Sequence, residues 1–276
     1  MSRIIYSLGE PVICGGTLVP CQIIGELRKR GYDAFAIADW HNPELEKYCG
    51  TPFRTWEDLE TDETDIIIAV RWEQCEELEK YQGRKIQFVQ GNDRAYYEMI
   101  NHTDLQKMLD KRNDHKWELI GVSDYVLQDF KRGVVIPDGI DDRFFINLGL
   151  ERDIDALCVG NNEKLKNVDY AIGRAKLDGH KRIVWMGRET NQVEGVECIT
   201  NPPQDIIPSI YQRSKHVYIY SLSEGFSLPL WEASASGCIV HTHDMGPNKD
   251  WVYTREEAEK YTWKNSVDKL LEYLKI

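Results

Sequence analysis

The chain has 276 residues, of which 42% are hydrophobic and 29% charged, a balance typical of a folded globular protein and unlike a disordered one. Its formal net charge is −12, and residues 1–150 carry 18 Lys and Arg against 27 Asp and Glu, a net charge of −9. Such an acidic chain has no broad attraction to nucleic acid or to anionic lipid. A local basic pocket for a nucleotide diphosphate is still compatible with it.

The N-terminal residues 1–8 run directly into a β-rich pattern, without the charged and apolar regions of a signal peptide. No apolar run approaches the roughly 20 residues that span a bilayer. The seven cysteines are scattered and never form a Cys-x-x-Cys pair, which favours reduced thiols. A cytoplasmic protein without a membrane span is therefore expected.

Short β-rich segments alternate with amphipathic ones throughout the chain. In the first half, strands are expected at 3–8, 33–38, 65–70, 85–89, 117–122 and 134–136, with helices at 18–30, 74–81, 94–109 and 124–130. In the second half, strands are expected at 154–159, 182–186, 217–220 and 239–241, with helices at 168–177, 205–213, 230–236 and 255–276. The alternation predicts two doubly wound parallel-sheet domains, joined near the charged stretch 141–152.

Ligands of doubly wound domains bind where the carboxyl ends of the strands meet the following loops. The first such loop, 9–16, ends in Gly15-Gly16, where an anion can approach the backbone and the amides of a helix start. A purely structural turn explains these glycines equally well. The loop after the strand at 154–159 contains Gly160 and Lys166, and a lysine there can neutralise a diphosphate or remain solvated.

The loop and helix at 221–237 give the strongest signal. Glu224 and Glu232 are eight residues apart, separated by the connector Gly225-Phe226-Ser227-Leu228, whose amides can face an anion. A carboxylate near a helix start can accept two ribose hydroxyls, as acids do in dinucleotide sites. The small residues at 233–237 permit close packing of the helix on the sheet.

This segment resembles the Glu-x7-Glu signature of family 4 retaining glycosyltransferases, written E-G-F-G-L-P-x-x-E-A-x-A-x-G. Further segments, in the same order along the chain, resemble that family: Gly15-Gly16, residues 30–33, residues 120–123, residues 135–141, and Gly160 with Lys166. The resemblance implies the GT-B fold, with two Rossmann-like domains facing a cleft. It divides the chain into an acceptor-side domain at 1–145, a donor-binding domain at 146–254, and a helix at 255–276 that packs back toward the first domain.

The resemblance also assigns roles to matching residues. Glu232 would hold the donor ribose, Glu224 would contact sugar and diphosphate, Lys166 would neutralise the diphosphate, and Gly16 would contact it. The full set implied for donor binding is Gly15, Gly16, Gly160, Asn161, Lys166, Gly225, Phe226, Ser227, Leu228 and Glu232. The catalytic candidates are Glu224, Lys166, Asn92 and Asp93.

This sequence departs from the family at three places. Asn161 stands where the family has a phosphate-binding Arg, so anion stabilisation depends more on Lys166. Ser227 replaces a glycine, which narrows the backbone angles allowed there. Residues 88–93 lack the family's histidine, which makes Asn92 and Asp93 the candidates to face the sugar.

Two motifs suggest metal binding but have simpler explanations. Asp153-Ile-Asp155 has the D-x-D form of metal-dependent transferases, yet it precedes a strand, so a solvated strand edge is favoured. His241 and His243 could chelate a metal, but the sequence supplies no obvious third ligand. No metal and no other cofactor is therefore expected.

The expected function is a metal-independent hexosyl or glycosyl transfer (EC 2.4 class) from a UDP-, GDP- or ADP-sugar to an acceptor hydroxyl with retention of configuration. The nucleotide-sugar is a substrate, and a glycan or small-molecule acceptor is favoured. Transfer to modified DNA is an alternative, opposed by the net charge of −9, because duplex binding normally needs a basic face. A non-catalytic nucleotide-sugar-binding protein is the third possibility.

Overall fold

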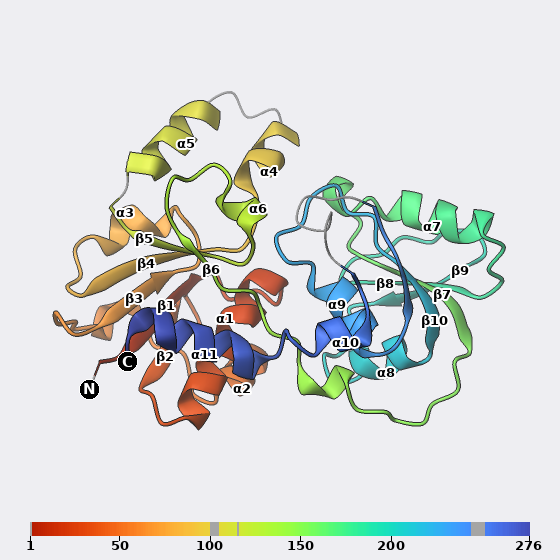
Figure 1. Ribbon diagram of the computed structural model, residues 1–276, viewed down its shortest axis with the longest axis horizontal. Coiled ribbons are helices and arrows are strands. Elements are labelled where there is room, and N and C mark those ends of the chain that lie inside the picture. Colours follow the sequence, from red (N-terminus) through yellow and green to blue (C-terminus); the bar gives the residue numbers. More distant parts are fainter. Residues whose placement is uncertain (1, 100–104, 115, 244–251) are drawn as a thin grey trace. The chain divides into compact units, whose positions relative to one another are not determined.

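The computed structural model describes residues 2–99, 105–114, 116–243 and 252–276, which form two compact units (Figure 1). The first unit comprises residues 1–139 and 263–276, and the second comprises residues 140–262. The chain therefore enters the second unit just before the expected join at 141–152 and returns to the first unit at Trp263.

The first unit contains a six-stranded sheet in the order β2-β1-β3-β4-β5-β6, in which every neighbouring pair is parallel. Its strands are β1 (Ile4–Gly9), β2 (Ala34–Ala38), β3 (Ile66–Ala69), β4 (Arg84–Val89), β5 (Glu118–Gly121) and β6 (Val134–Val135). Its helices are α1 (Gly15–Lys29), α2 (Pro43–Cys49), α3 (Gln74–Leu78), α4 (Asp93–Met99), α5 (Leu105–Asp114), α6 (Asp124–Leu127) and α11 (Trp263–Leu274), with a 3₁₀ turn η1 (Trp56–Asp58).

Helices cover both faces of this sheet. Figure 1 shows α1, α2 and α11 on one face and α3 and α5 on the other. Strand side chains such as Phe35 and Ile67 pack with Cys75 and Leu78 of α3 in one buried cluster. The near-continuous apolar runs of β1, β2 and β3 are explained by this burial on both faces.

The last helix, α11, is anchored to the first unit by polar contacts as well as by its buried apolar side chains. Arg30, at the end of α1, donates to the carbonyl of Lys264 at 2.9 Å and pairs with Asp268. Arg84 donates to the carbonyl of Leu274 at 3.0 Å. Val267 and Leu270 of the same helix are buried.

The second unit contains a five-stranded parallel sheet in the order β11-β10-β7-β8-β9. Its strands are β7 (Ile154–Val159), β8 (Ile183–Gly187), β9 (Val196–Thr200), β10 (Ser214–Tyr218) and β11 (Ile239–His241). Its helices are α7 (Val168–Leu177), α8 (Ile207–Gln212), α9 (Leu228–Ala235) and α10 (Arg255–Ala258), with 3₁₀ turns η2 (Asp142–Phe144) and η3 (Lys164–Lys166). Figure 1 shows α7 on one face and α8, α9 and α10 on the other.

The expectation of two doubly wound α/β domains is confirmed, with differences in detail. The prediction of a single helix at 255–276 is wrong, because the segment is divided into α10 and α11. Between these helices, Ile140 donates its N–H to the carbonyl of Tyr261 at 2.7 Å and pairs with Thr262 as in a sheet, which interrupts the helix. The helix expected at 94–109 corresponds to α4 and α5, and residues 100–104 lie outside the described residues.

Two elements were not predicted. Strand β9 lies at a sheet edge and is largely accessible, so it lacks the apolar run of a buried strand. Helix α2 is short but well specified: the Asn42 side chain accepts from the N–H groups of Glu44 and Leu45, Pro43 occupies the first turn, and Gly50 ends the helix at a φ of 66°. None of the described helices combines the length and the apolar character that a bilayer crossing demands.

Candidate functional site

The order in which the chain adds strands to the sheet of the second unit reverses between β7 and β10. The chain builds β7, β8 and β9 outward and then returns to place β10 on the other side of β7. At such a switch point the loops that follow the two strands diverge and leave a crevice for a ligand. The two loops remain tied together: Leu222 donates its N–H to the carbonyl of Leu165 at 2.8 Å, and the Asn167 side chain donates to the carbonyl of Tyr220 at 3.1 Å.

Lys166 and Glu224 meet at this switch point. Lys166 ends the 3₁₀ turn after β7, and its Nζ donates to Glu224 Oε1 in the loop after β10 at 2.8 Å. Their side chains are 29% and 14% exposed. The pair is thus partly withdrawn from water. In such surroundings the attraction between the two charges is stronger than at an open surface. The structure brings together two residues that the sequence predicted for one site.

Gly160 is required where the chain leaves β7. Its φ is +151°, and a Cβ added there would lie 2.8 Å from Cγ2 of Val168 and 3.1 Å from Cβ of Lys166. A side chain at this position would displace the stem of Lys166. The glycine therefore positions the lysine by leaving room for it.

Asn161 joins the loop after β7 to the loop after β8. Its Oδ1 accepts from the backbone N–H of Arg188 at 2.8 Å, and its Nδ2 donates to Oε1 of Glu163 at 3.1 Å. Both ends of the amide are occupied by these contacts. Asn161 brings no charge to the site. Its side chain holds the backbone of Arg188 next to the loop after β7.

The connector to α9 contains a strained residue. Ser227 is the N-cap of α9, with φ +58° and ψ 63°, a left-handed conformation that residues other than glycine adopt at a cost. Its side chain is buried, and its hydroxyl has no hydrogen-bond partner among the described residues. Gly225 and Phe226 are buried before it, and Leu228 and Pro229 begin the helix.

Glu232 lies in the second turn of α9 and is half-buried. Burial raises the pKa of its carboxyl to about 7. Tyr211, whose hydroxyl favours the charged form, and Arg143 oppose the increase in pKa, while the charge of Asp141 adds to it. The carboxylate is therefore poised to change charge near neutral pH.

The first unit has a pocket at its own switch point, between β1 and β3. The pocket has a volume of about 320 Å³ and is lined by residues near the carboxyl ends of β1, β3 and β4 and in the segments that follow them, including Glu10, Gly16, Trp72, Gln87 and Tyr97. Gly15 and Gly16, expected in a loop, instead form the first turn of α1. An added Cβ at Gly15 would meet no atom of the described residues within 4 Å, so their packing does not require this glycine. The carbonyl of Gly16 accepts from Gln90 Nε2 at 2.9 Å.

Asn92 is buried before α4 with its amide fully engaged. Nδ2 donates to the carbonyl of Tyr125 at 3.1 Å, and Oδ1 accepts from the N–H of Ala95 at 2.9 Å. These bonds connect the start of α4 to α6. Asp93 begins α4, and its side chain lies outside the described part of the chain.

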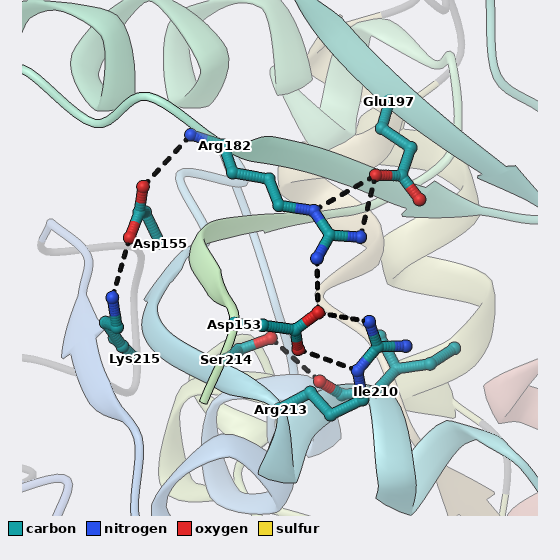
Figure 2. A network of polar contacts seen from close by, with 8 residues as sticks. All are labelled: Asp153, Asp155, Arg182, Glu197, Ile210, Arg213, Ser214 and Lys215. Carbon is teal, nitrogen blue, oxygen red and sulfur yellow. Dashed lines mark hydrogen bonds and ion pairs between the residues drawn. The ribbon is translucent and has the colours of Figure 1, made fainter. Parts of the chain in front are cut away.

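The acids of the D-x-D motif lie at the amino ends of the strands, the edge opposite the switch-point loops. Figure 2 shows Asp153 held by Arg182 and Arg213. Arg213 Nε donates to Asp153 Oδ1 at 2.8 Å. Lys215 donates to Asp155 at 2.8 Å, and its hydrogen bond and charge help to lower the pKa of Asp155 to about 2. These contacts tie the starts of β7, β8 and β10 together, and the carboxylates serve that network.

The histidines of the His-x-His motif do not converge. His241 Nε2 lies 2.9 Å from His216 Nδ1, whereas His243 Nε2 lies 3.0 Å from the carbonyl oxygen of Ser221. Within the ranges that the structure describes, no group of three or more His, Cys, Asp or Glu is arranged to hold a metal ion.

Arg188, at the carboxyl edge of the sheet, is not among the residues expected from the sequence. It is exposed and directly follows Gly187, the last residue of β8. A glycine and a cation directly after a strand are the signal that identified Gly160 and Lys166.

No protein-family model matches the sequence, and no curated protein matches it. Solved structures do match over the whole chain. HepE from Anabaena, in complex with UDP and glucose, has a TM-score of 0.75 at 12% identity, with 100% of both chains covered. Sucrose-phosphate synthase from Thermosynechococcus elongatus has a TM-score of 0.74 at 12% identity, with 100% of this chain and 98% of that chain covered.

The pneumococcal O-GlcNAc transferase GtfA, in complex with UDP and GlcNAc, has a TM-score of 0.70 at 12% identity, with 99% of this chain and 98% of that chain covered. Identities this low establish a common fold and leave the activity to be argued from the site. The chain has the GT-B fold of these glycosyltransferases.

Proposed function

We propose that this protein is a metal-independent glycosyltransferase that moves a sugar from a nucleoside-diphosphate sugar to an acceptor hydroxyl with retention of configuration. The observation that carries the proposal is the Lys166–Glu224 pair at the switch point of the second unit. A lysine beside the start of a helix is suited to a diphosphate. Two proteins of the same fold, Anabaena HepE and pneumococcal GtfA, were solved with UDP, which makes UDP the first nucleotide to test.

The second unit would bind the donor. Glu232 would accept hydrogen bonds from the ribose hydroxyls, and the amides of residues 225–228 would face the diphosphate or the sugar. The buried Ser227 hydroxyl, which has no partner among the described residues, is a further donor available to a ligand. The charged form of Glu232 is the better acceptor, so donor binding depends on its ionisation.

Charge neutralisation would drive the chemistry. The bond between the anomeric carbon and the diphosphate oxygen breaks, and the negative charge on that oxygen grows as the sugar leaves. Lys166 would stabilise this charge most in the transition state. For retention, the acceptor hydroxyl attacks from the face that the diphosphate leaves, and its proton passes to the departing phosphate oxygen. No side chain is then needed as a covalent nucleophile.

The pocket of the first unit is the proposed acceptor site. Trp72 and Tyr97 offer aromatic surface for a sugar ring, and Glu10, Gln87 and Gln90 offer hydrogen-bonding groups for its hydroxyls. A volume of about 320 Å³ suits a small saccharide or another polar small molecule. The acidic character of residues 1–150 argues against a duplex DNA acceptor.

The test begins with thermal shifts in UDP-, GDP- and ADP-sugars, followed by nucleotide release with the best donor. Release should continue in EDTA, and the anomeric configuration of the product, read by NMR, should equal that of the donor. Binding without turnover across saccharide acceptors would indicate a non-catalytic nucleotide-sugar-binding protein. Loss of turnover on chelation, restored by Mg²⁺ or Mn²⁺, would contradict metal independence.

A further inference from the structure

The cation expected to neutralise the diphosphate already has a carboxylate partner. Lys166 lies 2.8 Å from Glu224, so the two charges cancel at the switch point. A nucleoside diphosphate brings more than one negative charge to that place. If the donor binds as proposed above, a second positive group near Lys166 would supply the charge that the pair lacks.

The loop after β8 approaches this point closely. The carbonyl oxygen of Gly160 lies 2.3 Å from the position of a Cβ added at Gly187, so the two glycine backbones touch. Trp185 Nε1 donates to the same carbonyl at 2.8 Å, which fixes the contact from β8. A side chain at Gly187 would push the loops after β7 and β8 apart.

Hydrogen bonds hold the residues that follow in place. The Arg188 N–H donates to Asn161 Oδ1 at 2.8 Å, and the Asn162 N–H donates to the carbonyl of Glu189 at 3.0 Å. Gly160 adjoins both the stem of Lys166 and Gly187, the residue that precedes Arg188. Lys166 and Arg188 therefore extend from segments that meet at one glycine at the carboxyl edge of the sheet.

We propose that Arg188 contacts the donor diphosphate and supplies, beside Lys166, the second positive charge of the site; this inference rests on the proposed function. A guanidinium is suited to the task because it presents a planar fork of donors that matches phosphate oxygens and stays charged at every relevant pH. Asn161 acts as a positioning residue, since its side chain fixes the backbone from which Arg188 extends.

The experiment compares the binding of UDP and of uridine, which has no phosphate, by calorimetry. The variants are Arg188→Ala, Arg188→Lys and, as a control, Lys181→Ala, an exposed cation at the opposite end of β8. Arg188→Ala should weaken UDP binding about tenfold or more and leave uridine binding within about twofold. Arg188→Lys should recover part of the loss, because lysine keeps the charge without the fork. Lys181→Ala should bind both ligands normally.

The outcomes separate this inference from the proposed function. If the unaltered protein binds UDP and Lys166→Ala weakens it while Arg188→Ala does not, the inference is wrong and the donor site stands. Equal weakening of UDP and uridine by Arg188→Ala would place Arg188 at the nucleoside and overturn the inference as well. An unaltered protein that binds none of UDP, GDP and ADP would overturn the proposed function and this inference with it. Thermal melts establish that the variants are folded.

Discussion

Lys166 and Glu224 are 58 residues apart in sequence, yet their side chains form an ion pair with 2.8 Å between Nζ and Oε1. The pair joins the loop after β7 to the loop after β10 across the switch point of the sheet. Each residue was expected to serve the donor on its own. Because of this contact, replacing either residue leaves the charge of the other without this ion-pair partner.

A double-mutant cycle tests this coupling. Lys166→Ala should lower turnover more than donor affinity, because the lost charge matters most as the sugar leaves. It should also weaken UDP binding, since Glu224 then repels the diphosphate. Lys166→Ala/Glu224→Gln should recover part of that affinity, with a coupling of about 0.5–3 kcal/mol measured by calorimetry. Strictly additive effects would show that the pair does not act on the bound nucleotide.

Donor affinity should depend on pH through Glu232, whose pKa burial raises to about 7. UDP-glucose is the suitable probe, because its phosphates do not titrate in this range. Its affinity should increase by at most about tenfold per pH unit up to pH 7 and level off above, as Glu232 becomes charged. Glu232→Gln should flatten the profile and bind more weakly at pH 8. An unchanged profile in this variant would remove Glu232 from the donor site.

The same raised pKa has a consequence for stability. The folded protein binds the Glu232 proton more tightly than the unfolded chain, whose glutamate titrates near pH 4.3. The favourable contribution is complete below that pH and is lost as the pH rises through about 7. Glu232→Gln should therefore gain thermal stability relative to the unaltered protein between pH 5 and pH 8. A gain that does not grow with pH would contradict the shifted pKa.

Ser227→Gly should stabilise the protein. Serine at φ +58° costs about 1–2 kcal/mol, and its buried hydroxyl has no partner in the described structure, while glycine loses about 0.5–1 kcal/mol of chain entropy. A net gain of about 1 kcal/mol would raise Tm by roughly 2–4 °C. Ser227→Ala removes the hydroxyl but keeps the backbone strain, so it should gain less. Equal melting temperatures for the two variants would show that the backbone strain at Ser227 is no larger than the entropy cost of glycine, about 0.5–1 kcal/mol.

Asp138 is a buried acid of the first unit, and its Oδ1 has no partner among the described residues. Burial raises its pKa to about 8. Its contribution to stability is complete below the unfolded value near 3.9 and is lost as the pH rises through about 8. Asp138→Asn, which is neutral at every pH, should therefore gain stability over the unaltered protein by up to about 1.4 kcal/mol per pH unit between pH 5 and 8.

Thermal melts at pH 5, 6, 7 and 8 measure this gain. Asp39→Asn is the matched control, because it makes the same chemical change at an exposed position of the same unit. A constant difference between Asp138→Asn and the unaltered protein across this range would mean that Asp138 titrates as an ordinary carboxyl.

The sequence alone was sufficient for the architecture and for the segments of interest. Parallel strands covered on both faces must be almost wholly apolar, so β1, β2, β3 and β7 were visible as apolar runs. Strand β9 was missed because an edge strand is partly solvated and loses that signature. The glycines, lysine and glutamates of the second unit stood out as candidates because they follow strand ends, where ligands of doubly wound domains bind.

Only the tertiary structure decided which of these residues meet. The strand order β11-β10-β7-β8-β9 places the loops after β7, β8 and β10 at one edge, which no local pattern encodes. That order pairs Lys166 with Glu224 and puts Arg188 beside Asn161. It also assigns Asp153 and Asp155 to a network at the opposite edge. Side chains separated by dozens of residues acquire their partners from strand pairing and helix packing, and pairing in a sheet is set by the whole fold.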